Sequence, residues 1–142
     1  MDLETVSPAD FGRSLRGLGL NLLCRNLRKM AAFLEAVFGL TIHRLSDDFA
    51  LVRHGETLIQ LHRDATFARH PLHGLLPEEP PRGAGAQVYL FGIDPDAACG
   101  RAETAGGLVI EPPADKPHGL REATILSPEG YAFSPAVPAP CS

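Results

Sequence analysis

The stretch SPEGYAFS, Ser127–Ser134, determines how the C-terminal part of the chain is expected to fold. Pro128 and Gly130 favour a tight turn, because proline fixes its own φ and glycine adopts positive φ at no steric cost. The three residues that follow, YAF, favour a strand. The stretch therefore predicts a turn that leads into the last strand of a sheet, over residues 131–137.

Upstream of this turn, residues 85–137 show the order strand, helix and three strands. The segment AQVYLFGI predicts the first strand. Asp94 followed by Pro95 favours a helix start, since aspartate caps the helix and proline suits its first position. Gly106 and Gly107 end this helix. LVIEPP predicts a strand that its prolines stop, and REATILS predicts the strand before the turn.

Residues 17–63 show the same order of elements. GLGLNLLCR predicts a strand. Asn26 is a suitable helix cap, apolar residues recur at helical spacing through LRKMAAFLEAVFGL, and Gly39 is a natural stop. Three short strands, LTIHRL, DFALVR and TLIQLHR, complete the unit.

The repeat predicts an α+β fold with a single domain, 1–142, built from two βαβββ modules, 17–63 and 85–137. Residues 64–84 are rich in proline, histidine and glycine and predict a linker loop. Neither module alone buries both faces of its sheet, so the modules should pack together or exchange between chains. The first 15 residues fit a short helix or a loose arm, and the tail PAPCS is expected to be disordered.

Charge, apolar runs and cysteine content indicate which binding partners and which cellular compartment to expect. The net charge is −4 and the basic residues are scattered, which argues against nucleic acid. No apolar stretch approaches the roughly 20 residues of a membrane helix, so we expect no membrane contact. Cys24, Cys99 and Cys141 lie far apart, an odd number that fits a reducing compartment. We therefore expect a soluble cytoplasmic protein.

Three segments in order, NLLCRN with RKMAAFLEAVFGL, GAGAQVYLFGID and PHGLREATILSPEGYAFS, resemble the vicinal oxygen chelate superfamily. This superfamily includes glyoxalase I, bleomycin-resistance proteins and extradiol dioxygenases. The resemblance covers most of the chain. It implies paired βαβββ modules that form a curved mixed sheet around a cleft, in a homodimer whose partner completes each cleft.

The metal enzymes of this superfamily hold a divalent ion with one side chain from the first and the last strand of each module. The resemblance places these positions at Gly19, Gln60, Gln87 and Ser134, where the last is usually glutamate. Glycine has no donor, a serine hydroxyl is a weak ligand, and two neutral glutamines cannot balance the charge of the ion. The resemblance therefore implies neither a metal at this place nor another cofactor.

The histidines do not rebuild such a site. His62 lies two residues after Gln60, on the same face of the strand but about 6–7 Å further along. A role in ligand contact and a place at an exposed strand end are both open for it. His70 and His73 form an H-x-x-H pair without further ligands, and His118 lies in a turn where we expect it to be solvated.

Alternation along the strands lines the expected cleft with neutral polar and aromatic side chains. Such a pocket suits a largely apolar organic molecule, which rings can stack on and amides can orient. The alternatives are that the polar residues bond to one another and that the rings belong to the core. The candidate ligand-binding residues are Asn21, Gln60, His62, Gln87, Tyr89, Phe91 and Ser134.

The leading hypothesis is a metal-free protein that sequesters a small aromatic or heterocyclic molecule, as the bleomycin-resistance branch does. The alternative is a lyase, isomerase or dioxygenase of the same superfamily. It would need an atypical metal site, or acid–base chemistry from His62, Tyr89 or Glu122. Arg121 and Glu122 either reach the mouth of the cleft or form an ordinary surface pair. A ligandless structural module is the third hypothesis.

Overall fold

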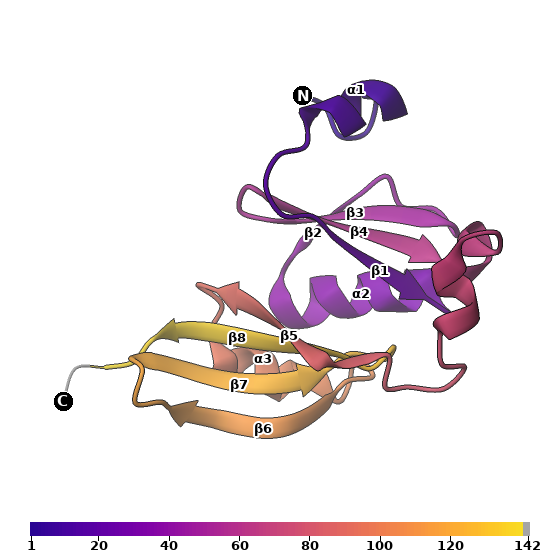
Figure 1. Ribbon diagram of the computed structural model, residues 1–142. Helices are drawn as coiled ribbons and strands as arrows, with labels where there is room; N and C mark the ends of the chain where they lie inside the picture. The colour runs from indigo at the N-terminus through magenta and orange to yellow at the C-terminus, as the bar shows by residue number, and fades with distance from the viewer. Residues whose placement is uncertain (141–142) are drawn as a thin grey trace.

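The computed structural model describes residues 1–140. Figure 1 shows two sheets, each with its own helix, and a further short helix at the N-terminus, above the first sheet. The elements are α1 (Pro8–Ser14), β1 (Leu20–Cys24), α2 (Leu27–Phe38), β2 (Thr41–His43), β3 (Phe49–His54), β4 (Thr57–Arg63), the 3₁₀ turns η1 (Asp64–Phe67) and η2 (Pro71–Leu75), β5 (Gly83–Phe91), α3 (Pro95–Ala102), β6 (Leu108–Asp115), β7 (Leu120–Leu126) and β8 (Tyr131–Pro138).

The two sheets have the same topology, which confirms the predicted α+β fold of repeated βαβββ modules. Their strand orders are β1-β4-β3-β2 and β5-β8-β7-β6. In each sheet the first and last strands of the module pair in parallel, and the other neighbours are antiparallel. The last strand of each module therefore lies beside its first strand, and the side chains of both share one face.

Helix α2 forms where the sequence predicts it. The side chain of Asn26 accepts a hydrogen bond from the backbone N–H of Lys29 at 3.1 Å, and Gly39 ends the helix with φ of 69°. Its apolar residues face a core that also takes in side chains from α3 and from both sheets. The rings of Phe38 in α2 and Phe133 in β8 lie 5.6 Å apart within this core. The two modules of one chain are thus joined through their helices.

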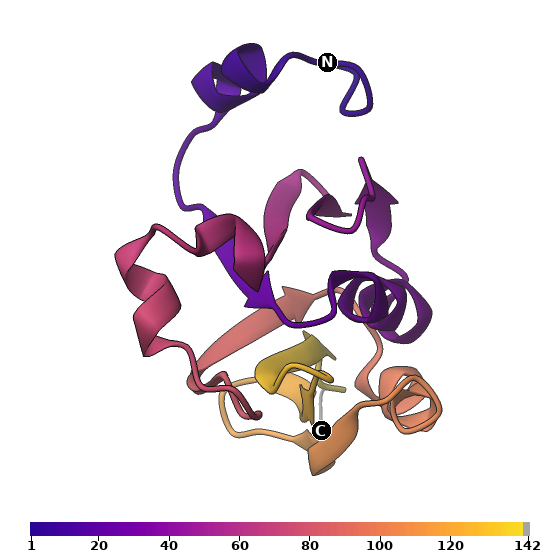
Figure 2. The same ribbon diagram turned by 90° about the vertical axis from the view of Figure 1, so that its right-hand side faces the viewer.

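Helices α2 and α3 lie on the same side of the molecule, as Figure 2 shows. Strand residues alternate between this shared core and the opposite side of each sheet. We call the opposite side the outer face of a module. Leu22 and Ile59 point into this core from module 1, and Val88 and Phe133 point into it from module 2. Their strand neighbours, which include all seven candidate ligand-binding residues, occupy the outer faces.

The turn SPEG holds the two modules together. Glu129 is only 2% exposed, and its carboxylate accepts hydrogen bonds from the backbone N–H groups of Arg25 and Asn26, both at 3.0 Å. The hydroxyl of Tyr131 donates to the carbonyl of Leu23 at 2.7 Å. The C-terminal hairpin therefore binds the backbone that joins β1 to α2.

The segment between the modules is more ordered than a plain loop. Residues 64–84 contain η1, η2 and the first residues of β5, which begins at Gly83. Its two ends meet, because the guanidinium of Arg82 binds both carboxylate oxygens of Asp64 at 2.6 and 2.7 Å. This half-buried pair fixes the path of the segment along the edge of module 1.

Two local predictions are wrong. LVIEPP does not stop at its prolines: β6 continues to Asp115, with irregular pairing between Glu111 and Ala114. β6 is an edge strand, where a missing N–H donor is tolerated. The expected disordered tail is partly ordered, because Pro138 ends β8 and the N–H of Ala139 donates to the Gly119 carbonyl at 2.9 Å. Residues 141–142 of that tail lie outside the described residues.

The N-terminal segment forms an arm, residues 1–18, that includes α1 and packs on the outer face of module 1. Leu3 and Phe11 are buried there against Leu51 of β3. The guanidinium of Arg44 donates to the Val6 carbonyl at 2.7 Å. Of the two predicted possibilities, a short helix and a loose arm, the structure shows a short helix in a segment that is held against the sheet. None of the helices within residues 1–140 is long and apolar enough to span a membrane.

Candidate ligand-binding faces

On the outer face of module 1, the parallel pairing of β1 and β4 sets Asn21 opposite Gln60. His62 lies next along β4, and its Nδ1 donates to the Asn21 side-chain oxygen at 2.6 Å. Partial burial lowers the pKa of His62, so the neutral ring is favoured. Because Nδ1 carries the hydrogen in this bond, Nε2 remains an acceptor. The ring of His62 lies between those of Phe49 and Phe67, with centroids 4.9 and 5.4 Å away.

On the outer face of module 2, Gln87 and Ser134 bind each other. The Gln87 amide donates to the Ser134 hydroxyl at 2.9 Å, and the Thr124 hydroxyl lies 3.2 Å from the same oxygen. Tyr89 and Phe91 stack with centroids 5.2 Å apart and an angle of 7° between their planes. Phe91 is 59% exposed, so this pair presents an aromatic surface at the edge of the sheet rather than in the core.

A buried carboxylate on the same face has partners that the sequence did not indicate. Glu122 in β7 is 3% exposed, and it accepts a hydrogen bond from the Tyr89 hydroxyl at 2.9 Å. His118 Nε2 lies 2.8 Å from its other oxygen. This bond to Glu122 raises the pKa of Tyr89. Glu122 therefore forms no pair with Arg121, which binds Asp96 and Asp115 instead.

The residues at the metal position of the superfamily do not fit a divalent ion. Gly19 lies just before β1, and Asn21 rather than Gly19 is the residue opposite Gln60. The Ser134 hydroxyl is fully buried and already accepts from Gln87. Over residues 1–140, no three His, Cys, Asp or Glu side chains lie close enough to hold a metal ion. The donors left are neutral amides, which do not balance the charge of such an ion.

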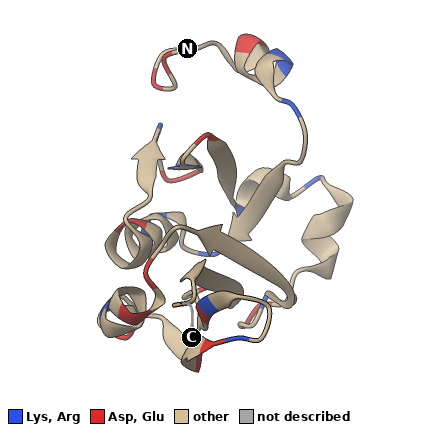
Figure 3. Ribbon diagram, turned by 90° about the vertical axis from the view of Figure 1, so that its left-hand side faces the viewer, with Lys and Arg blue, Asp and Glu red and all other residues tan. Residues whose placement is uncertain are grey.

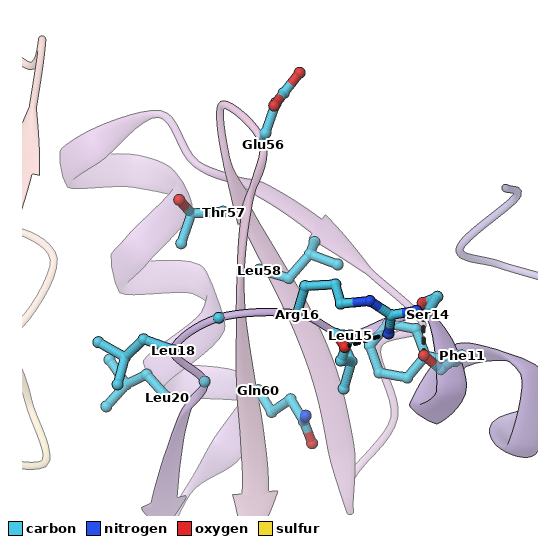
Figure 4. A pocket seen from close by; sticks show the side chains of 12 residues that line it. Phe11, Ser14, Leu15, Arg16, Leu18, Leu20, Glu56, Thr57, Leu58 and Gln60 are labelled. Atoms are coloured by element: carbon cyan, nitrogen blue, oxygen red, sulfur yellow. Dashed lines mark hydrogen bonds between the residues drawn. The ribbon is translucent and has the colours of Figure 1, made fainter.

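Two cavities open beside these residues. One of about 690 Å³ lies between the modules and is lined by Leu18, Leu58, Gln87, Tyr89 and Phe91 among others. The other, of about 710 Å³, lies between the N-terminal arm and β4, with Leu58 and Gln60 on its sheet side (Figure 4). Each is large enough for an organic molecule of ordinary cofactor or drug size.

The comparisons with known proteins agree with this architecture. Residues 19–134 match the family model described as Glyoxalase/Bleomycin resistance protein/Dioxygenase superfamily. The protein named "Putative glyoxylase CFP32", from Mycobacterium bovis and from Mycobacterium tuberculosis, is 31% identical over 113 residues. That match covers 77% of this chain but only 39% of the relative, so the chain spans well under half of the relative's length.

Solved structures show the same fold at lower identity. A glyoxalase/bleomycin resistance protein/dioxygenase family enzyme from Burkholderia phytofirmans superposes with a TM-score of 0.70 at 20% identity, over 84% of this chain and 96% of that one. The fosfomycin resistance protein FosX from Mesorhizobium loti superposes with a TM-score of 0.60 at 15% identity, over 88% and 94% of the two chains. The chain belongs to the glyoxalase/bleomycin resistance protein/dioxygenase superfamily.

Proposed function

We propose that the protein binds a small, largely apolar organic molecule, aromatic or heterocyclic, without a metal at the superfamily position. The observation that carries this proposal is the outer face of module 2. There the Gln87 amide donates a hydrogen bond to the Ser134 hydroxyl. The stacked rings of Tyr89 and Phe91 border an apolar cavity. Flat ligands bind such rings by stacking, and the exposed amide edge orients them.

Sequestration of a toxic compound is the use that this binding suggests. The superfamily name and the FosX relative both refer to resistance, against bleomycin and fosfomycin. We extend resistance as a class of use to this chain, with binding as its proposed means, and we extend neither drug. The modest net charge of −4 does not favour a strongly cationic ligand such as bleomycin.

A direct test combines metal titration with ligand screening. Chelator-stripped protein is titrated by calorimetry with manganese, nickel, zinc and ferrous ions, and we expect no micromolar binding. Flat aromatic and heterocyclic compounds are then screened by thermal shift. Gln87→Ala and Tyr89→Ala should weaken the binding of a hit, whereas His73→Ala, an exposed change in η2, should not. Tight binding of one ion per chain, or unchanged affinity in both variants, would contradict the proposal.

We also propose a homodimer, in which a partner completes each cleft. Within one chain the modules meet through their helices, and the arm covers part of the outer face of module 1 only. Large apolar side chains are exposed on the module 2 sheet and beside β1, including Phe91, Ile110 and Leu18. Such a surface is typical of a protein contact. A monomer at micromolar concentration in sedimentation velocity would refute this proposal.

A second candidate function is metal-free proton transfer, and one observation favours it. Glu122 is buried between the Tyr89 hydroxyl and His118 Nε2, a carboxylate–imidazole pair beside a phenol. Such groups serve as acid and base in lyases and isomerases. An enzyme of this kind would exchange the acidic C–H of a bound α-hydroxyketone for deuterium, and Glu122→Gln would abolish the exchange. Absence of exchange from the native protein would leave binding as the function.

A reducing compartment such as the cytoplasm suits the described cysteines. Cys24 and Cys99 are free thiols, and burial raises the pKa of both. A thiol with a raised pKa is less often the reactive thiolate. We therefore propose a cytoplasmic location, which fluorescence microscopy of a tagged chain in its own cells would test.

A further inference from the structure

The N-terminal arm lies outside the part of the chain that matches the superfamily. The family match begins at residue 19, whereas the arm comprises residues 1–18. Figure 1 shows α1 above β3 and β4, on the side of the sheet that faces away from α2. The segment that covers the face carrying Gln60 therefore lies outside the part of the chain that the family model describes.

Contacts at several points hold the arm against the sheet, so the arm forms one wall of the cavity over β4. Leu3 and Phe11 are buried on the sheet, and Leu51, their contact in β3, is the direct neighbour of Gln60. The Glu4 carboxylate accepts from the backbone N–H of Arg44 at 3.0 Å. Both apolar and polar side chains of the arm make these contacts, and together they hold the arm in place over the sheet.

Two cavities meet at Gln60, one on either side of Phe11. The larger, of about 710 Å³, extends from Gln60 toward Thr57 and Glu56, and the smaller, of about 380 Å³, extends toward Phe49. Within residues 1–140 the Gln60 amide makes no hydrogen bond to another side chain, unlike Gln87 on the other module. A donor and an acceptor thus face a cavity that is partly open to solvent and lined by both apolar and polar side chains, where a polar atom of a ligand can bind them.

Arg16 supplies a positive charge at the same cavity. Its Nη1 donates to the carbonyls of Arg13 and Leu15, both at 2.8 Å, and these bonds hold the guanidinium in place. No carboxylate lies within ion-pair distance of Arg16 in the part of the chain that the structure describes. Figure 4 shows Arg16 beside Phe11, with Glu56 at the far, hairpin end of the cavity. Nε and Nη2 therefore remain free to bind an anion.

We propose that the arm and β4 form a binding site for an aromatic organic anion, a carboxylate or sulfonate on an apolar frame. The frame packs against Phe11 and Leu58, the acid group binds Arg16, and a polar atom of the frame binds Gln60. This inference rests on the proposed small-molecule function and names the place and the charge of the ligand. It makes the arm a determinant of specificity that lies outside the residues matched by the family model.

Two dyes of the same shape and different charge test this site in the full chain. 8-Anilinonaphthalene-1-sulfonate carries a sulfonate, and N-phenyl-1-naphthylamine is its neutral counterpart. Arg16→Gln should weaken the anionic dye about tenfold, the loss expected for one charge-assisted contact, and leave the neutral dye unchanged. Arg16→Lys should restore most of the loss. Arg13→Gln, an exposed arginine of the same arm that pairs with Asp10, is the matched control.

Gln60→Glu adds a negative charge of nearly the same shape to the floor of the cavity, and it should also weaken only the anionic dye. Unchanged affinity of this dye in both Arg16→Gln and Gln60→Glu would overturn the inference. If Tyr89→Ala instead weakens both dyes, the ligand lies on module 2, and the proposed function survives without the arm site. If neither dye binds the native protein, the inference and the proposed function both fail.

Discussion

Replacement of Glu129 by glutamine tests whether the SPEG turn holds the two modules together. The change keeps the shape of the side chain and removes its charge. In the native protein both carboxylate oxygens accept a backbone N–H, from Arg25 and from Asn26, each at 3.0 Å. A glutamine keeps one acceptor oxygen and turns an NH₂ group toward the other N–H. One hydrogen bond is therefore lost, and two donors face each other inside the protein.

The magnitude follows from this exchange. A hydrogen bond to a charged group contributes about 1.5–3 kcal/mol, and a buried donor left without a partner costs about 1–3 kcal/mol. The two effects overlap, so we expect the free energy of unfolding to fall by about 3 kcal/mol. For a chain of this size such a loss lowers the midpoint of thermal unfolding by roughly 6–12 °C. The variant should still fold, since domains are typically stable by about 5–15 kcal/mol.

Glu79→Gln is the matched control, because Glu79 also faces Arg25 but from the solvent. Its carboxylate lies 3.8 Å from the guanidinium and its side chain is 87% exposed, so removal of the charge should change stability by less than about 1 kcal/mol. Urea unfolding followed by circular dichroism compares the two variants. Equal midpoints for Glu129→Gln and Glu79→Gln would show that the turn contributes no more than a surface charge.

Three further changes should be measurable. Gly130→Ala should lower the free energy of unfolding by more than about 2 kcal/mol in a urea titration, because φ is 82° and a Cβ would lie 2.4 Å from the Cα of Pro81. Phe11→Ala should destabilise by about 2–3 kcal/mol in the same titration, the low end for a buried ring, because its cluster is small. The pKa of His62 is lowered by burial, so the unfolded chain binds the proton more readily. Stability should therefore fall as the pH drops below about 6.5, and His62→Gln should flatten this dependence of the urea midpoint.

Periodicity predicted the elements because the residues that specify them lie close together in sequence. Asn26, Gly39 and the apolar spacing between them are enough to place α2. The role of Glu129 could not be predicted in this way, since its partner Arg25 lies 104 positions away. β6 was predicted too short for a related reason: whether a strand tolerates proline depends on its place at the edge of the sheet.

The site was harder to predict than the fold. Alternation placed the seven candidate residues on the outer faces, because period 2 needs only the strand assignment. Alternation does not show which of these side chains already have hydrogen-bond partners within the chain. Gln87 and Gln60 look equivalent in the sequence and both line a cavity, yet within residues 1–140 only Gln87 bonds to another side chain, that of Ser134. For Glu122 the sequence suggested the mouth of the cleft or a surface pair with Arg121, and its actual partners could not be predicted, because Tyr89 and His118 come from another strand and a turn.

The two modules differ at equivalent places of one scaffold, and we propose different tasks for them on this basis. Parallel pairing of first and last strands brings Asn21 to Gln60 in module 1 and Tyr89 to Ser134 in module 2. In module 2, Ser134 bonds to Gln87 and the Tyr89 hydroxyl bonds to Glu122, which leaves the ring surface of Tyr89 and Phe91 to contact a ligand. In module 1 the free Gln60 amide is covered by an arm that brings its own arginine. We therefore propose that ligands are selected through the rings of module 2 and through the charge of Arg16 beside module 1.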